Sequence, residues 1–335
     1  MANHQVKLSV LDLAPVLDGG TPAQSFRNTV DLAQHVEQWG YNRYWLAEHH
    51  NMTGVASSAT SVIIGHVAAH TQTIRVGSGG IMLPNHAPLM IAEQFGTLES
   101  LFPGRIDLGL GRAPGTDQPA MRALRRGLHS DGNDFPEQLH ELRSYLNPAM
   151  GGGVPGVRAV PGEGLNIPIW LLGSSGFSAQ LAGQLGLPFA FASHFAPDYL
   201  LQALELYHRH FQPSAALEKP YVMIGVNAVV AATDEEARRL ATSQEQQFLS
   251  LIRGERGGLK PPVDTMDGRW TAQEQLLVYG KMLKYSAVGS PDTVKRKLDT
   301  IIEETRTDEL IVAGQIYDHQ ARLHSYELLA QIMGE

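Results

Sequence analysis

Three residues whose side chains transfer protons or bind metals follow one another at the end of an apolar segment. In the stretch YWLAEHHNMTG, Glu48, His49 and His50 come directly after residues 44–47, which are typical of a buried strand. Imidazole is the commonest metal ligand in proteins. Adjacent strand residues point to opposite faces, however, so the two histidines do not readily converge on one ion, and no HExxH motif accompanies them. The pattern argues against a metal site here.

A second set of residues suits a phosphate group. The stretch LLGSSGFS joins an apolar segment to a helix-like one through Gly173, Ser174, Ser175, Gly176 and Ser178. The first N–H groups of a helix are unpaired and its dipole is positive there, so serine hydroxyls at this point add further donors for an anion. An ordinary serine N-cap explains the same residues. Arg112, which follows another apolar segment, could supply a charge-assisted partner for the same phosphate.

Glycines end a third apolar segment, in the stretch VGSGGIMLPNHAP. Gly77, Gly79 and Gly80 lie where glycine is costly in a strand and often marks a close approach between the backbone and a ligand. A flat aromatic ring lying against this backbone fits the pattern. Neither a Walker A loop nor a dinucleotide fingerprint is present, because the glycine spacings are wrong for both.

The elements that must position these residues alternate between short apolar runs and longer helix-like segments, which is typical of βα units and a parallel sheet. Helices are expected over residues 22–39, 57–71 and 87–102. Eight strands are expected, over residues 6–13, 44–47, 74–79, 106–110, 167–173, 187–193, 221–232 and 308–314. This number favours an α/β (β/α)₈ TIM barrel over an open doubly wound sheet, and its active site would lie at the carboxyl ends of the strands.

Two insertions interrupt this order within a single predicted domain over residues 1–335. Residues 147–164 are rich in glycine and proline and are expected to form a loop. Residues 253–275 are polar, contain adjacent prolines and lie between the seventh and eighth predicted strands. Long loops of this kind are often lids or binding segments, and a mobile surface insertion is the alternative.

Composition limits the class of protein. The 335 residues contain no cysteine, which excludes disulfides and thiolate metal sites and favours a reducing compartment. A net charge of −8 argues against general nucleic-acid binding. The sequence has no signal-peptide pattern and no apolar stretch long enough for a membrane helix. A soluble, cytoplasmic, globular protein is therefore expected.

Taken in order, five motifs resemble those of the bacterial luciferase-like flavin-dependent monooxygenases, and the similarity to the non-luminescent bacterial group is greatest. They are WLAEHH, VGSGGIMLPNHAP, FPGRIDLGLGRAPG, GSSGFSAQLAGQLGLP and YSAVGSPDTVKRKLDTI, and they extend over nearly the whole chain. The resemblance implies a (β/α)₈ barrel that binds FMN at the carboxyl ends of its strands. It also implies that reduced flavin reacts with O₂ to oxidise a small organic substrate.

The resemblance assigns roles to individual residues. His49 matches the catalytic histidine of the family, with Glu48 and His50 beside it, and Glu48 would hold the tautomer or charge of His49. The Gly79–Gly80 bond matches a non-proline cis peptide that lies against the flavin ring. His50, on the opposite side of the strand, is expected to affect packing and stability more than turnover.

The same resemblance implies a set of contacts with the flavin. Arg112 matches the arginine at the flavin phosphate, and Ser175 and Ser178 match its hydroxyl donors, with Ser174 and Gly176 in the same turn. Gly111 stands where luciferase has a reactive cysteine beside the flavin, which is a departure from the light-emitting members. This departure leaves the expected FMN binding untouched.

The expected enzyme takes FMNH₂ from a separate, transiently bound flavin reductase, since no NAD-binding fingerprint appears. The resemblance implies a homodimer through the helices at residues 57–70 and 88–101, which are poor in charge. Two alternatives remain open. One is an oxidoreductase that uses a deazaflavin for hydride transfer on the same barrel, and the other is a non-catalytic flavin-binding protein.

Overall fold

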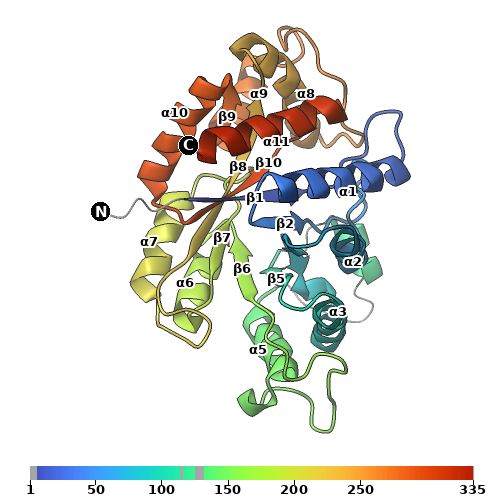
Figure 1. Ribbon diagram of the computed structural model, residues 1–335, viewed down its shortest axis with the longest axis vertical. Coiled ribbons are helices and arrows are strands. Elements are labelled where there is room, and N and C mark those ends of the chain that lie inside the picture. Colours follow the sequence, from blue (N-terminus) through green and yellow to red (C-terminus); the bar gives the residue numbers. More distant parts are fainter. Residues whose placement is uncertain (1–5, 114–115, 125–131, 335) are drawn as a thin grey trace.

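The eight predicted strands pair in chain order into one parallel sheet (Figure 1). The computed structural model describes residues 6–113, 116–124 and 132–334. The barrel strands are β1 (Lys7–Asp12), β2 (Arg43–Leu46), β3 (Arg75–Ser78), β5 (Ile106–Gly111), β6 (Ile169–Gly173), β7 (Phe189–Phe191), β8 (Val222–Val230) and β10 (Glu309–Ala313). β10 pairs in parallel with both β1 and β8, which closes the sheet. The predicted (β/α)₈ barrel is therefore confirmed.

Helices surround the barrel (Figure 1). They are α1 (Pro22–Gln38), α2 (Thr60–His70), α3 (Pro88–Leu101), α4 (Gln118–Leu124), α5 (Phe135–Leu146), α6 (Gly176–Leu185), α7 (Leu200–His210), α8 (Asp234–Arg253), α9 (Ala272–Leu277), α10 (Pro291–Thr305) and α11 (His319–Gly334). The start of α1 has a local cause, because the Thr21 hydroxyl accepts a hydrogen bond from the Gln24 amide and proline occupies the first helical position. Within the described ranges, no helix is both long and apolar enough to cross a membrane.

Two short strands were not predicted. β4 (Ile81–Met82) continues the direction of β3 after Gly79 and Gly80, and it pairs with the end of β5. β9 (Ser286–Gly289) pairs in parallel with the last four residues of β8. With two residues, β4 is too short to produce a periodic signal. β9 was missed because only two of its four residues, Ala287 and Val288, are apolar.

The two predicted insertions differ in how they are held. Residues 147–164 contain one short 3₁₀ helix, η2 (Pro148–Met150), and are otherwise turns and loop, as predicted. Residues 253–275 run from the last residue of α8 into α9, and Leu259 and Met266 of this segment are buried. Backbone hydrogen bonds of 2.8 Å join Leu259 to Val16 and to Asp18, so the segment packs on the loop that follows β1. Its function as a lid stays a prediction.

The side chains of β2 alternate between the outside and the inside of the barrel. Tyr44 and Leu46 pack in the main core between sheet and helices, whereas Trp45 and Ala47 belong to a separate apolar cluster inside the barrel. The other members of that cluster are Leu11, Trp170, Ala190, Met223 and Ile311. Trp45 and Trp170 meet edge to face with ring centroids 5.2 Å apart. This layer fills the middle of the barrel.

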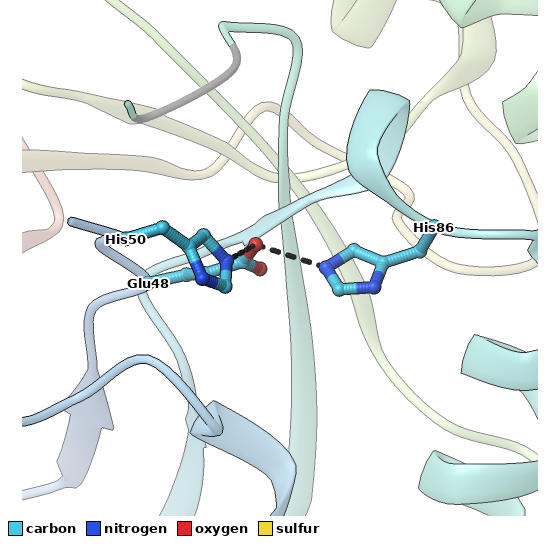
Figure 2. A group of neighbouring side chains, drawn as sticks. All are labelled: Glu48, His50 and His86. Atoms are coloured by element: carbon cyan, nitrogen blue, oxygen red, sulfur yellow. Dashed lines mark hydrogen bonds and ion pairs between the residues drawn. The ribbon is translucent and has the colours of Figure 1, made fainter. Parts of the chain in front are cut away.

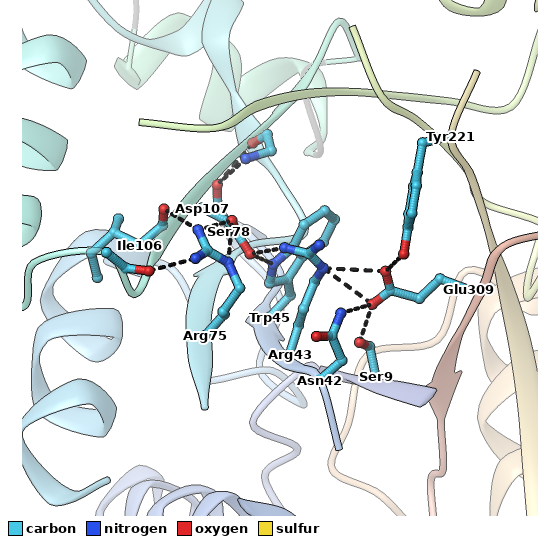
Figure 3. Close-up of polar contacts among 12 residues, drawn as sticks. Ser9, Asn42, Arg43, Trp45, Arg75, Ser78, Ile106, Asp107, Tyr221 and Glu309 are labelled. Atoms are coloured by element: carbon cyan, nitrogen blue, oxygen red, sulfur yellow. Dashed lines mark hydrogen bonds and ion pairs between the residues drawn. The ribbon is translucent and has the colours of Figure 1, made fainter. Parts of the chain in front are cut away.

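Below that layer, charged side chains close the end of the barrel where the strands begin (Figure 3). Arg43 donates to Asp107 at 2.6 Å and to Glu309 at 3.1 Å. Arg75 donates to the other oxygen of Asp107 at 2.7 Å, and the Tyr221 hydroxyl donates to Glu309 at 2.8 Å. Two arginines and two fully buried carboxylates thus compensate each other's charge.

Arg43 is the centre of this network. Burial acts to lower the pKa of its guanidinium, but the charges of Asp107 and Glu309 outweigh burial and raise that pKa above its usual value. The guanidinium also lies 4.7 Å from the ring centroid of Trp170, in the apolar layer above. Arg43 therefore connects the charged end of the barrel to its apolar interior.

Replacing Arg43 with alanine leaves Asp107 and Glu309 buried without their shared partner. We expect the free energy of unfolding to fall by about 3–5 kcal/mol, the usual cost of breaking a buried ion pair. Urea unfolding followed by circular dichroism measures this. The matched control is Arg209→Ala, because Arg209 pairs with Glu205 on α7 and both side chains are about two-thirds exposed. That control should change stability by less than about 1 kcal/mol, and equal losses in the two variants would contradict the role given to Arg43.

Candidate active site

The segment that follows β2 carries the predicted histidines to the open end of the barrel. Arg43, Trp45 and Ala47 face the interior, so His49 continues the inward series, while Glu48 and His50 belong to the outward series. The positive charge of a protonated His49 lowers the pKa of His194, a residue that follows β7. That His49 and His50 lie on opposite sides of this segment follows from the same alternation and stays a prediction.

The Glu48 carboxylate holds two imidazoles at once (Figure 2). Its Oε1 lies 2.8 Å from Nε2 of His50 and 2.9 Å from Nε2 of His86, and its Oε2 accepts from the Met82 amide at 2.9 Å. An ionised carboxylate only accepts hydrogen bonds, so both Nε2 atoms must carry hydrogen. One oxygen therefore fixes the orientation of two rings that come from different loops.

Glu48 remains ionised despite being only 1% exposed. Burial acts to raise the pKa of its carboxyl, but the hydrogen bonds from His50 and His86, the charge of His86 and the Met82 amide together lower that pKa to about 2. The negative charge is thus sustained by these neighbours. Without the two imidazoles, the same burial would favour the neutral acid.

These contacts correct one expectation. Glu48 was expected to hold the tautomer of His49, but its hydrogen bonds go to His50, His86, Met82 and, at 3.4 Å, Asn85. The expectation failed because neighbouring residues of an extended segment point apart, so Glu48 faces the loop after β4 and not His49. That replacement of His50 affects packing and stability more than turnover stays a prediction, and its contact with the buried carboxylate is a reason to expect the effect on stability.

The same three side chains have the composition of a metal site. One ligand atom from each of Glu48, His50 and His86 lies within 4.8 Å of the others. Around a tetrahedral zinc ion with bonds of roughly 2.0–2.1 Å, ligand atoms lie about 3.3 Å apart. The observed 2.8 and 2.9 Å are hydrogen-bond distances, which account for the arrangement without an ion. That no metal binds here stays a prediction.

One wall of the barrel mouth consists of glycine backbone. The peptide bond between Gly79 and Gly80 is cis, as the family resemblance implied. A Cβ on Gly80 would lie 2.7 Å from the Gly109 carbonyl oxygen, and one on Gly79 would lie 2.6 Å from the Leu11 side chain. The Gly109 backbone therefore excludes a side chain at Gly80, and a side chain at Gly79 would require Leu11 to shift. Gly111 ends β5 beside Met82, where a Cβ would lie 2.7 Å from the Met82 sulfur.

The predicted phosphate turn lies at the start of α6. Ser175 is the N-cap residue with an extended backbone, but its hydroxyl makes no capping hydrogen bond. The first-turn amides of α6 and the hydroxyls of Ser174 and Ser175 are thus free of the usual cap contact at this turn. Ser178 is buried and packs against Gly173, where a Cβ would lie 2.7 Å from the Ser178 hydroxyl.

Arg112 lies beside this turn. Its guanidinium carbon is 4.4 Å from the ring centroid of Phe177, a first-turn residue of α6. In the part of the chain that the structure describes, no carboxylate forms an ion pair with Arg112, whereas Arg43, Arg75 and Arg322 each have one. An uncompensated cation next to open helix amides is an arrangement suited to a phosphate.

The sequence analysis assigned no role to two histidines that the structure brings to the site. His86 lies in the stretch NHAP after β4, and His194 lies in FASHFAP after β7. Both follow strands at the open end of the barrel, which is the signal that could have identified them. The structure adds His86 as the second partner of Glu48 and His194 as the neighbour of His49.

Known proteins resemble this chain over its whole length. The profile of the luciferase-like monooxygenases matches residues 6–309. An Escherichia coli (strain K12) protein named luciferase-like monooxygenase is 55% identical and covers 100% of this chain and 99% of its own. The N-acetyl-S-alkylcysteine monooxygenase of Bacillus subtilis (strain 168) is 36% identical over 97% of both chains. The solved structure of apo-MsnO8 is 36% identical, with a TM-score of 0.91 and 98% of both chains covered.

More distant solved structures share the fold alone. One is the oxygenating constituent of 3,6-diketocamphane monooxygenase from Pseudomonas putida in complex with FMN, at 19% identity and a TM-score of 0.72, covering 98% of this chain and 97% of its own. Another is an F420-dependent secondary alcohol dehydrogenase, at 13% identity and a TM-score of 0.66, with 96% of this chain and 97% of its own covered. The fold thus occurs with more than one flavin-type cofactor.

The Glu48 cluster makes a prediction about pH. A carboxyl whose pKa falls from 4.5 to about 2 on folding stabilises the protein above pH 4.5, and that contribution is lost as the pH falls toward 2. Glu48→Gln should therefore be less stable than wild type at pH 7, with the difference narrowing between pH 4.5 and pH 2. Urea unfolding at several pH values measures this. Glu205→Gln, at the exposed ion pair with Arg209, is the control, and a difference between Glu48→Gln and wild type that does not depend on pH would contradict the assignment.

Proposed function

We propose that this chain, which belongs to the luciferase-like monooxygenase family, is an FMN-dependent monooxygenase that uses reduced flavin and O₂ to oxidise a small organic substrate. The observation that carries a phosphate-bearing cofactor is the Arg112 guanidinium, which has no ion pair within the described residues and lies beside the first turn of α6, where Ser175 makes no capping hydrogen bond. Such a turn binds the phosphate of a nucleotide by its amides, its dipole and an adjacent cation.

The described residues fit FMN. Arg112, Ser174, Ser175 and Gly176 would hold the phosphate, and the buried Ser178 would support the turn from below. The wall around Gly79 and Gly80, where a Cβ would overlap neighbouring atoms, offers bare backbone for the face of a flat ring, and Gly111 lies at the same wall. Bound FMN would supply the redox chemistry with O₂, which no side chain of the protein can provide.

His49 is the residue that we propose transfers protons. It follows β2, which pairs with β3, the strand that leads into the glycine wall, and continuing the alternation of β2 gives its side chain an inward direction. An imidazole there can act as general acid and base near neutral pH. In this proposal Glu48 has an indirect role. Its carboxylate forms hydrogen bonds with His50 and His86 and so fixes the loop from which His49 projects.

Two alternatives are separated by simple measurements. A deazaflavin enzyme of the same fold would bind F420 more tightly than FMN, so titration with both cofactors distinguishes them. A non-catalytic flavin-binding protein would bind FMN without consuming O₂ when FMNH₂ and a substrate are present. The position of His49 after β2, where an imidazole can transfer protons, favours an enzyme over a non-catalytic flavin-binding protein.

Partners and location are further proposals. We propose that a separate reductase supplies FMNH₂, that the enzyme is cytoplasmic, and that two copies associate through α2 and α3. Val62, Met90 and Leu101 on these helices are 70%, 53% and 63% exposed, which is a reason to expect a covering partner. Light scattering at micromolar concentration measures the mass, and a monomer would contradict the homodimer.

The relative named N-acetyl-S-alkylcysteine monooxygenase suggests which substrates to test first. We propose thioethers of this kind as the first panel, beginning with N-acetyl-S-methylcysteine. Oxidation that depends on FMNH₂ is measured by O₂ consumption and by the mass of the products. A gain of one oxygen atom, or loss of the S-alkyl group, would identify a substrate.

Arg112→Ala should weaken FMN binding by roughly ten- to a hundredfold, because a charge-assisted phosphate contact is worth about 1.5–3 kcal/mol. Riboflavin, which lacks the phosphate, should bind wild type and variant about equally and more weakly than FMN binds wild type. Flavin fluorescence titration measures all four affinities. Arg209→Ala, which removes the same charge from exposed α7, should bind FMN as wild type does. Equal FMN affinity in the Arg112 variant and wild type would end the phosphate assignment.

His49→Ala should leave FMN affinity within a few-fold of wild type, while turnover falls by roughly 10²–10⁴, the usual contribution of general acid–base catalysis. Its pH–rate profile should lose the limb that imidazole ionisation produces in wild type. Rapid mixing with preformed FMNH₂ separates binding from turnover. If His49 only shapes the wall, FMN affinity will fall while the turnover of the bound complex hardly changes.

A further inference from the structure

His194 is a histidine of the barrel mouth that the proposed chemistry leaves unused. It follows β7, and in the closed order of the eight strands β7 lies four places from β2, on the opposite wall. His49 projects from the β2 side, and its charge acts on His194. The two imidazoles therefore face each other across the interior of the barrel.

The barrel is shaped to admit the His194 ring. Ala190 of β7 and Met223 of β8 face the apolar interior, and Gly225 continues the inward series of β8 one layer higher. His194 lies in the turn after β7, with its ring against Gly225. The Nδ1 atom of His194 lies so close to Gly225 that any Cβ at that position would overlap it. Residue 225 must therefore be glycine for the ring to occupy this place.

Three side chains fix the backbone around the ring. Asn227 donates from its amide to the His194 carbonyl at 2.6 Å, and Gln244 of α8 donates to Asn227 at 2.5 Å. The Ser193 hydroxyl donates to the Gly225 carbonyl at 2.6 Å. The segment after β7 is thus tied to β8 and α8, and the ring is held in a definite position.

One nitrogen of the ring is unpaired. Nδ1 is buried without a hydrogen-bond partner among the residues that the structure describes. About nine in ten buried polar groups in proteins are paired, so an unpaired imidazole nitrogen needs an explanation. A buried N–H without a partner is rarer than a buried acceptor without one, so Nδ1 is the unprotonated nitrogen and Nε2 carries hydrogen.

His194 is also uncharged. Burial lowers the pKa of its imidazole to about 4, and the charge of His49 lowers it further. The layer beneath it contains Trp45, Trp170 and Met223 and offers no counter-charge. A neutral donor above an apolar layer suits a neutral acceptor better than an ion, because an ion would lose its water there without compensation.

We propose that His194 binds the substrate: its Nε2–H donates a hydrogen bond to an uncharged acceptor oxygen, such as a carbonyl or sulfoxide oxygen, from the wall opposite His49. This role rests on the proposed function, since it makes the barrel mouth the place of oxidation. The substrate then lies between the two imidazoles, with its polar group toward β7 and β8. His194 determines specificity, whereas His49 carries the proton chemistry.

Dimethyl sulfoxide is a probe with one acceptor oxygen, and it tests the site without knowledge of the substrate. Crystals of wild type, His194→Gln and His194→Phe are soaked in it. In wild type, we expect the sulfoxide oxygen to lie within hydrogen-bond distance of Nε2. In the Gln variant it should lie within hydrogen-bond distance of the side-chain amide. In the Phe variant the probe should be absent from this place. Wild-type crystals without the probe at His194 would overturn the proposal. Binding unchanged in the Phe variant would show an adventitious additive only and would also overturn it.

Kinetics provide the second test, with N-acetyl-S-methylcysteine as the substrate. His194→Phe should raise KM by roughly three- to tenfold, the worth of one hydrogen bond, with a smaller effect on kcat. His194→Gln should recover part of the loss, and FMN affinity and the melting temperature of both variants should match wild type. An unchanged KM in the Phe variant would overturn the proposal. Loss of FMN affinity with unchanged KM would assign His194 to the flavin wall.

Failure of this proposal and failure of the proposed function give different results. If wild type binds no FMN, the proposed function fails, while the position of the sulfoxide still decides whether His194 binds an acceptor. If FMN binds and the sulfoxide does not occupy the site, only the role of His194 fails.

Discussion

Successive side chains of an extended strand point to opposite faces, and the organisation of this molecule depends on that constraint at β2. The inward series begins with Arg43 in the charged network, continues with Trp45 and Ala47 in the apolar layer, and ends with His49 at the open mouth. The outward series joins Tyr44 and Leu46 of the main core to Glu48 and His50. A shift of one residue in this register would exchange the two series and remove both the network and the site.

Much of the fold could be predicted because its strands are apolar and bounded by polar or glycine-rich turns. The predicted strand at residues 106–110 differs by one residue from β5, and the predicted helix at residues 22–39 differs by one residue from α1. Strand ends were less accurate where apolar residues continue beyond the paired ones. Residues 187–193 were expected to form a strand, yet β7 covers only Phe189–Phe191, because the chain then turns inward at Ser193 and His194.

The partners within the site could not be predicted in the same way. The pairing of Glu48 with His86 joins residues 38 positions apart, and it depends on how the chain leaves β3, crosses the two glycines and pairs again as β4. Periodicity does not encode such a path. The facing of His49 and His194 likewise depends on the closure of the barrel, which brings strands four places apart to opposite walls. The sequence alone could indicate that each histidine lies at the end of a strand.

The filled interior of the barrel restricts the path by which small molecules can enter and leave. The charged network of Arg43, Asp107 and Glu309 blocks one end of the barrel, and the layer containing Trp45 and Trp170 blocks its middle. Both plugs lie below the carboxyl ends of the strands, so a molecule bound at those ends cannot pass through the axis of the barrel. Molecules that bind there together share one side of the barrel, and the deeper one leaves after the one above it.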